Sequence, residues 1–367
     1  MKKVIFLVFG IMLCGSCIDR VDIKIPDNAN SQLVVDGIIT DAPGPYTVRL
    51  SRASRIAEFL NFRKFITVKS VILFDNVGNS ELMTEVQTGT YQTKAGGIQG
   101  VVGRKYAIKI EMQDGQVYES VPDIMNPVGE VDSLYYKLET FQPISDPTRY
   151  GLRVFADSKG LREGANLFRW KFSGTYLIYT FPLLHTKSQD GFSCVPDPRS
   201  CGGDGPYGSC TCCTCWVTEY EAEPRISDNQ FVSDGVFRNV EIGYVPVEYF
   251  SFQNKYRISV ELMSLSRTAF DYWKIIQTQK EGASSLFQPP TGKARTNVFE
   301  KNGLGEAVGL FYASAIKKKH LYVTRAEVST QLTAIRIPHW NCEIGLIAED
   351  CRLAFPFSTT TKPVDWE

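Results

Sequence analysis

The chain has 367 residues, with 40 basic and 40 acidic residues and no formal net charge. This length is sufficient for two domains, and 43% hydrophobic with 22% charged residues excludes a largely disordered chain. The balanced charge gives no electrostatic footprint for nucleic acid, and three histidines are too few for a multi-histidine metal enzyme. Aromatic residues make up 12% of the chain, which favours β-strands.

The N-terminus has the pattern of an export signal. Two lysines precede an apolar run, Val4–Leu13, which is about half the length of roughly 20 residues that a membrane-spanning helix needs. A glycine and a serine stand directly before Cys17, and this arrangement resembles a bacterial lipobox. We therefore expect a signal peptide over residues 1–16 and a diacylglycerol with palmitate-type chains on the Cys17 thiol. Ordinary cleavage that leaves a free Cys17 is the alternative.

Residues 17–32 are interpreted as a lipidated tether, because they contain Pro26, Asp27, Asn28, Asn30 and Ser31.

Residues 33–122 have the pattern of a small β-sandwich. Leu33–Ile39 and Val68–Phe74 are apolar strand-like runs, and from Tyr106 to Met112 apolar residues alternate with mostly charged ones. Asp114-Gly115 then suits a tight hairpin turn. Short strands with frequent turns predict an immunoglobulin-like or transthyretin-like sandwich.

After a boundary at residues 123–127, residues 128–367 are predicted to form a larger β-rich domain. Strands of period two are predicted at Tyr150–Ala156, Phe168–Phe172 and Tyr256–Leu262, and the last strands at Val308–Ala313 and His320–Val328.

One main helix is predicted over about residues 264–281. Apolar residues recur there at intervals of three and four, either Ser264 or Ser266 suits the N-cap, and Gly282 suits the stop. The fold class is therefore mainly β with one main helix.

Several motifs together resemble a known family. They are Val35-Asp36-Gly37-Ile38-Ile39, Ser264-Leu265-Ser266 through Phe270-x-x-Trp273, Leu286-Phe287-x-Pro289-Pro290, Glu306-x-x-Gly309-x-Phe311-x-Ala313-Ser314 and Lys362-Pro363-x-x-Trp366. Over roughly residues 17–366 the chain resembles the Bacteroidota lipoproteins grouped as domain-of-unknown-function family 4249. The resemblance implies an outer-membrane lipoprotein, lipid-anchored and facing the cell surface, and often encoded near TonB-dependent transporters. It implies no established reaction.

Cysteines carry the most informative chemistry. Apart from Cys14 and Cys17, the chain has Cys194, Cys201, Cys210, Cys212, Cys213, Cys215, Cys342 and Cys351. Six of these eight lie in an insert at residues 185–215, and in an exported chain we expect disulfides.

Two pairings of the C-terminal cysteines are open at this point. Cys342 with Cys351 is the simplest pair, and the alternative joins one or both to Cys213 or Cys215. A thiolate cluster for Zn or Cu(I) is the weaker interpretation, because the spacing within the insert is not that of a zinc knuckle. We expect no metal and no other cofactor.

Catalytic motifs are sparse, so we expect a protein that is not an enzyme. His185 precedes a glycine-rich loop and is interpreted as a surface histidine. The predicted function is that of a binding or accessory lipoprotein that works with a TonB-dependent outer-membrane transporter in nutrient uptake. Tyr207 and Trp216 are the candidate binding residues in or beside the insert. A structural or adhesive surface module is the alternative, and a hydrolase is the less favoured third interpretation.

Overall fold

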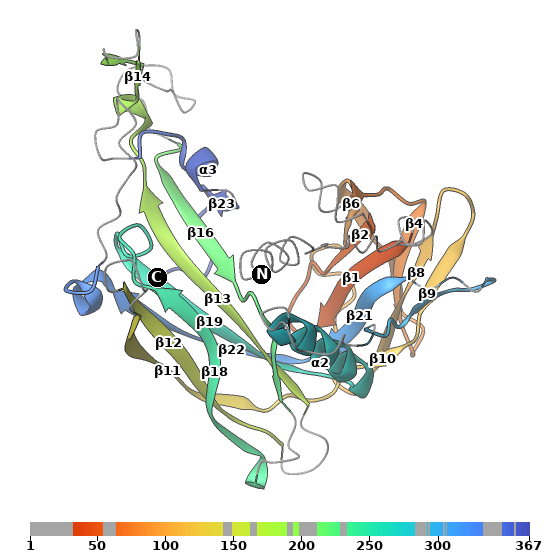
Figure 1. The fold of residues 1–367 in the computed structure, drawn as a ribbon. Helices are drawn as coiled ribbons and strands as arrows, with labels where there is room; N and C mark the ends of the chain where they lie inside the picture. The colour runs from red at the N-terminus through yellow and green to blue at the C-terminus, as the bar shows by residue number, and fades with distance from the viewer. Residues whose placement is uncertain are drawn as a thin grey trace, which may run out of the picture.

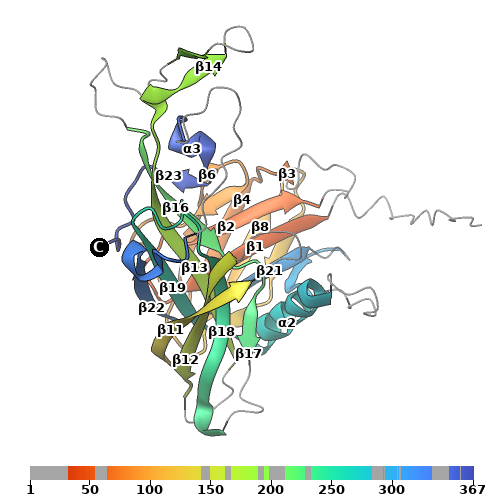
Figure 2. The same cartoon turned by 60° about the vertical axis from the view of Figure 1, so that its left-hand side comes forward.

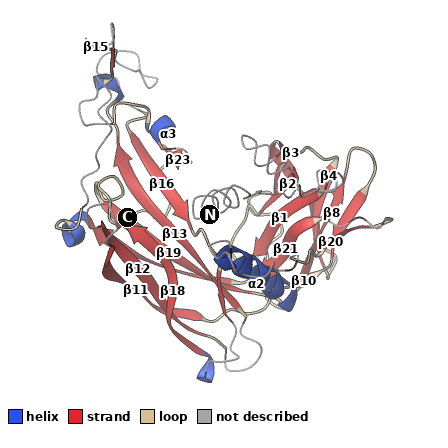
Figure 3. Ribbon diagram, in the orientation of Figure 1, coloured by secondary structure: helices blue, strands red, loops and turns tan. Residues whose placement is uncertain are grey.

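A computed structural model describes most of the chain. The described residues are 32–53, 64–141, 149–161, 167–188, 194–197, 211–227, 233–282, 292, 294–303, 305, 307–332, 347–355 and 357–367. The predicted signal peptide, Cys17 and nearly all of the predicted tether lie outside the described residues. Within them the chain is mainly β, as predicted, and the main helix, α2, lies between two lobes (Figures 1 and 3).

The first lobe is a sandwich of two sheets. One sheet runs β21-β1-β2-β7-β6 with β3 beside β2, and the other runs β20-β9-β8-β4-β5 with β10 beside β8. The first of these sheets contains β1 (Leu33–Thr40), β2 (Thr47–Arg52), β3 (Lys64–Phe65), β6 (Thr84–Gln87), β7 (Thr90–Gln92) and β21 (Val308–Ser314). The second contains β4 (Ser70–Asp75), β5 (Ser80–Leu82), β8 (Lys105–Glu111), β9 (Val117–Ser120), β10 (Asp123–Ile124) and β20 (Val298–Glu300).

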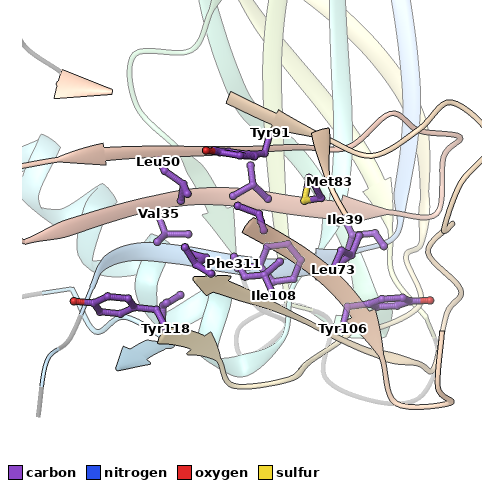
Figure 4. Packing of buried hydrophobic residues seen from close by; sticks show 14 of the residues in the cluster. Val35, Ile39, Leu50, Leu73, Met83, Tyr91, Tyr106, Ile108, Tyr118 and Phe311 are labelled. Carbon is purple, nitrogen blue, oxygen red and sulfur yellow. The ribbon is translucent and has the colours of Figure 1, made fainter. Parts of the chain in front are cut away.

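Alternation along the strands builds the core of this lobe. In β1, Val35 and Ile39 are fully buried while Asp36 is exposed, so the two faces of the strand differ sharply. Figure 4 shows Val35 and Ile39 in one cluster with Leu73 of the facing sheet and Phe311 of β21. The hydrophobic effect on these apolar side chains holds the two sheets together.

The predicted hairpin at Asp114-Gly115 joins β8 to β9. Gly115 has a φ of +88°, which glycine adopts without the steric cost that a Cβ would bring. The Asp114 carboxylate accepts a hydrogen bond of 3.0 Å from the backbone N–H of Gln116, and this fixes the turn.

A strand from far along the chain completes the first lobe. β21 pairs in parallel with β1 over seven residue pairs, and β20 pairs with β9. In Figure 1 the blue β21 therefore lies among red and orange strands. The buried Asn297 holds β21 in place, because its side-chain amide donates to the Phe311 carbonyl at 2.7 Å and accepts from the Phe311 N–H at 3.1 Å.

The boundary at residues 123–127 is consequently not a clean division of the sequence. Val308–Ala313, assigned above to the second domain, is hydrogen-bonded into the first lobe. The assignment is wrong because strand periodicity shows which face is buried and not which distant strand will pair. Asp123, within the expected linker, accepts a 3.0 Å hydrogen bond from the Ala313 N–H, and burial raises the pKa of its carboxyl.

The second lobe is also built from two sheets that share one core. One sheet contains β11 (Glu130–Phe141), β12 (Arg149–Lys159) and β18 (Val236–Pro246), in that order. The other runs β22-β19-β13-β16-β23 with β17 beside β13, and its bounds are β13 (Phe168–Tyr179), β16 (Thr214–Tyr220), β17 (Arg225–Ser227), β19 (Lys255–Ser264), β22 (Ile316–Thr324) and β23 (Ser358–Thr359).

Aromatic packing marks the centre of this second core. Trp170 of β13 packs edge-on against Phe237 of β18, with ring centroids 5.3 Å apart, and its indole N–H donates to the Ser158 hydroxyl at 2.9 Å. The expected last strand at His320–Val328 is displaced along the chain, because β22 begins at Ile316, before the predicted start. It ends at Thr324, and Arg325–Val328 forms a 3₁₀ turn, η4.

Helix α2 (Arg267–Gly282) joins the two lobes. Of the two predicted caps, Ser266 is the one that caps the helix, since its hydroxyl accepts a 3.1 Å hydrogen bond from the Ala269 N–H. Ser264 instead donates to the Asn126 carbonyl at 2.6 Å. The helix buries Ala269 and Phe270 in a small cluster that includes residues of β21 and β19.

The C-terminal tail is held on the second lobe by charge and aromatic contacts. The Arg257 guanidinium, which is largely buried, lies 2.7 Å from the Asp365 carboxylate and 5.8 Å from the Trp366 ring centroid. Lys255 lies 5.5 Å from the same ring centroid. These contacts explain why the tail motif ends in a tryptophan that is buried.

A small hairpin of β14 (Thr186–Ser188) and β15 (Cys194–Pro196) projects from one end of the second lobe (Figures 1 and 2). Near it are the 3₁₀ turn η2 (Pro182–Leu184) and the short helix α3 (Cys351–Ala354), while the 3₁₀ turn η3 (Ser233–Gly235) precedes β18. Among the described residues, none of the helices has both the length and the apolar character needed to cross a membrane.

Candidate functional site

A pocket of about 400 Å³ lies between helix α2 and the sheet that contains β1. We call it the α2 pocket. Strands β1, β2 and β21 contribute residues that include Asp36, Arg49 and Leu310, and the helix contributes Tyr272 and Trp273. The volume falls within the range of about 300–1,000 Å³ that is typical of small-molecule sites. None of these residues was singled out as a site by the sequence.

The alternation of β1 and β2 places the charged side chains of the pocket. Val35 and Leu50 point into the core of the first lobe, so their neighbours Asp36 and Arg49 point away from it and are exposed. Asp36 and Arg49 face each other directly in the antiparallel register of β1 and β2. The pocket therefore contains an acid and a base on adjacent strands.

Two consecutive aromatic residues of α2 form the opposite wall. The rings of Tyr272 and Trp273 are perpendicular, with centroids 5.5 Å apart. Burial, followed by the nearby Asp36 carboxylate and Tyr312, raises the pKa of the Tyr272 hydroxyl. The acid of β1 and the aromatic wall of α2 are therefore close enough to interact electrostatically.

A buried ion pair supports this wall from behind. The Arg169 guanidinium of β13 lies 3.7 Å from the centre of the Trp273 ring, which is a close cation–π stack. Its Nη2 atom lies 2.5 Å from the Glu221 carboxylate, and both of these side chains are at least 90% buried. Burial raises the pKa of Glu221, and Arg169 offsets only part of that effect. Trp273 is thus fixed between the two lobes.

Two charged residues of the pocket, Asp36 and Arg49, form no ion pair with each other in the described part of the chain. Among the described residues, Arg49 makes no ion pair and no side-chain hydrogen bond, and Asp36 makes none either. A second arginine, Arg52, also lines the pocket. The described lining therefore carries two cations and one acid beside an aromatic wall.

A second hollow, of about 230 Å³, lies in the second lobe. Tyr179, Phe181 and Tyr249 line it and are each about 40% exposed. Arg325 also lines it, with its guanidinium 5.0 Å from the Tyr249 ring centroid. It offers aromatic contact area but no acid, so it is chemically simpler than the α2 pocket.

One disulfide joins the cysteine-rich insert to the C-terminal segment. Cys215 of β16 is bonded to Cys351 of α3 across 136 residues, and both are fully buried. The prediction that Cys342 pairs with Cys351 is therefore wrong, and the alternative pairing with Cys215 is present. Proximity in sequence was a poor guide because the fold brings α3 against β16.

Two more of the candidate cysteines, Cys212 and Cys213, are also disulfide-bonded. Cys201, Cys210 and Cys342 lie outside the described residues, as does the side chain of Cys194. In the described part of the chain, no group of three His, Cys, Asp or Glu side chains is placed to hold a metal ion.

The two predicted binding residues are not brought together at a described surface. Tyr207 lies outside the described residues, and Trp216 lies within β16, half-buried and opposite Leu177 and Thr359. Trp216 therefore belongs to the sheet and not to a loop tip.

His185, interpreted above as a surface histidine, is largely buried. Its ring is 15% exposed and lies 3.0 Å from the Asp197 carbonyl and 3.3 Å from the Glu349 carboxylate. It connects the base of the projecting hairpin to the segment that precedes α3.

Comparison with known proteins places the chain in a family without a described activity. A family model with the description "Domain of unknown function (DUF4249)" matches residues 18–320. No curated protein matches the chain. The match includes β1, β2, α2 and β21, which are the elements that build the α2 pocket.

Proposed function

We propose, from the premise that the chain belongs to the DUF4249 family, that it is a non-enzymatic, lipid-anchored binding protein of the outer membrane. In this proposal Cys17 carries the lipid, residues 17–32 form the tether, and the folded lobes face the cell surface. The partner is a TonB-dependent transporter, to which the protein supplies a small nutrient ligand. The resemblance to Bacteroidota lipoproteins and the lipobox-like sequence before Cys17 support this location.

The α2 pocket is the observation that carries the binding role. It is of ligand size, and it combines charged groups with a fixed aromatic wall. It also lies close to the start of the fold, since Ala53 lines it and donates a backbone hydrogen bond to Gln32 at 3.1 Å. A tether that ends at residue 32 would hold the pocket near the membrane on which a transporter resides.

Fractionation of native cells tests the anchor. The wild-type protein should incorporate labelled palmitate and remain with the outer membrane after a high-salt wash. Cys17→Ala should incorporate none and should leave the membrane or accumulate as the uncleaved precursor. An unlipidated mature wild-type chain, detected by intact mass, would contradict the anchor.

Affinity purification in mild detergent tests the partner. The tagged wild-type protein should co-purify with a TonB-dependent barrel, identified by mass spectrometry. A tagged, unrelated lipoprotein of the same membrane serves as the control and should not enrich that barrel. Recovery of the wild-type protein without any barrel, from membranes that contain the transporter, would remove the accessory role.

A further inference from the structure

The two opposite charges of the α2 pocket lie on adjacent strands but do not form an ion pair in the described part of the chain. Asp36 and Arg49 are opposite each other across β1 and β2, where Cβ atoms are about 4.5–5.5 Å apart. Both are exposed to the pocket, yet among the described residues they form no ion pair with each other or with any other group. Two adjacent, opposite charges therefore remain available to a ligand.

The aromatic wall beside these charges is held rigid. Trp273 stacks on the Arg169 guanidinium at 3.7 Å and packs edge-on against Tyr312, with centroids 6.2 Å apart. Arg169 is fixed in turn by its buried ion pair with Glu221. A wall that is already ordered adds little entropy cost when a ligand binds, so the pocket is preorganised for an apolar group.

The Asp36 carboxylate, the Arg49 guanidinium and the aromatic wall together complement a single kind of molecule. A guanidinium binds a carboxylate through parallel hydrogen bonds, and a carboxylate binds an ammonium group. An α-amino acid carries both of these groups on one carbon atom, at a spacing that matches neighbouring side chains on paired strands. Its side chain would then lie against Tyr272 and Trp273, which favours a large apolar or aromatic side chain.

We propose that the α2 pocket binds a free α-amino acid with a large apolar or aromatic side chain. Arg49 binds the α-carboxylate, Asp36 binds the α-ammonium group, and the α2 aromatic residues contact the side chain. This inference rests on the proposed binding function and names the class of ligand for that pocket.

Titration calorimetry with three related probes separates the contributions of the two charged residues. L-Phenylalanine carries both charged groups, phenethylamine lacks the carboxylate, and 3-phenylpropionate lacks the ammonium group. The purified wild-type protein should bind L-phenylalanine at least tenfold more tightly than either of the other two probes, because each lost charged contact costs about that factor or more.

Two variants should show crossed patterns. Asp36→Asn should weaken binding of L-phenylalanine and phenethylamine roughly tenfold or more and leave 3-phenylpropionate unchanged. Arg49→Gln should weaken L-phenylalanine and 3-phenylpropionate and leave phenethylamine unchanged. Asp132→Asn and Arg238→Gln, at exposed positions of the second lobe, are the matched controls and should bind all three probes as the wild type does.

Three results would overturn the proposal: absence of L-phenylalanine binding at millimolar concentration, equal binding by wild type and both pocket variants, or tight 3-phenylpropionate binding that is insensitive to Arg49→Gln. Circular dichroism melting of each variant checks that it folds. A failure of the ligand proposal can be distinguished from a failure of the proposed accessory role. If the transporter still co-purifies while L-phenylalanine does not bind, only the ligand class is wrong.

Discussion

The two lobes are each completed by a segment that is distant in the sequence, and they secure that segment by different means. In the first lobe, β21 is added to β1 by backbone hydrogen bonds, and Asn297 reinforces the contact. In the second lobe, Cys351 of the C-terminal segment is bonded covalently to Cys215 of β16. The same structural requirement, closing a sheet with a late segment, is met once without and once with a covalent bond.

The difference follows from how much apolar surface each late segment buries. β21 supplies a run of buried residues, which includes Phe311 and Ala313, to a continuous core. The segment around α3 is only four residues long and leaves Leu353 72% exposed. A segment with so little buried area gains stability mainly when a disulfide limits the unfolded chain. The comparison therefore predicts that reduction of the disulfide will destabilise the second lobe. Backbone strain in β21 will instead destabilise the first lobe.

The largest effect should come from removal of the disulfide. Cys215→Ser with Cys351→Ser should reduce the free energy of unfolding of the second lobe by about 2–5 kcal/mol, as expected for a bridge that closes a long loop. Urea unfolding followed by tryptophan fluorescence measures this change, because Trp170, Trp216 and Trp366 lie in the second lobe. Hydrogen exchange in β4 and β8 should stay at the wild-type level. Equal loss of protection in both lobes would show that they unfold as one unit.

The next largest effect should come from strain in β21. Gly309 has a φ of +97°, and a Cβ at this position would lie 1.9 Å from the Val35 carbonyl oxygen. Gly309→Ala should therefore destabilise the first lobe by about 1–3 kcal/mol or more, and hydrogen exchange should increase in β1 and β21. Gly78→Ala is the control, because Gly78 has a φ of +96° with no atom near its Cβ position. If the two variants lose equal stability, the close approach of β21 to β1 contributes nothing.

A buried carboxylate should make the first lobe sensitive to acid. Burial alone would raise the pKa of Asp75, but hydrogen bonds from Asn79 and Val77 and the nearby Arg104 lower that pKa below the ordinary value of an aspartate. A lowered pKa adds stability above the unfolded-state value, and this contribution is lost as the pH falls through the folded-state value. Asp75→Asn should destabilise the lobe by about 1–2 kcal/mol at pH 7 and by progressively less below about pH 4. A wild-type–variant difference that is constant from pH 7 to pH 2.5, measured by urea unfolding, would contradict this.

The smallest effect should come from the C-terminal tail. Asp365 pairs with Arg257 at 2.7 Å, but its side chain is 66% exposed, so solvent screens the pair. Asp365→Asn should reduce the free energy of unfolding of the second lobe by less than about 1 kcal/mol, and 1 M salt should remove most of that difference. A larger loss that persists in high salt would show that the tail is held as firmly as the disulfide holds α3.

The local structure followed closely from the sequence. The strands of period two, the hairpin at Asp114-Gly115 and the helix capped by Ser266 all depend on residues close together in the chain. Periodicity and turn chemistry are properties of such short segments, so sequence patterns identify them. The sequence did not predict the candidate site, because Asp36 and Arg49 have the pattern of ordinary outward-facing residues of two strands.

By itself, then, the sequence determined that the chain is mainly β with one main helix, and it identified a set of cysteines suited to disulfides. Only the tertiary structure decided that β21 joins the first lobe, that Cys351 pairs with Cys215, and that α2 faces Asp36 across a pocket. The physical reason is that these contacts join segments more than 100 residues apart. Their geometry depends on how whole sheets pack, and neither residue periodicity nor spacing along the chain contains that information.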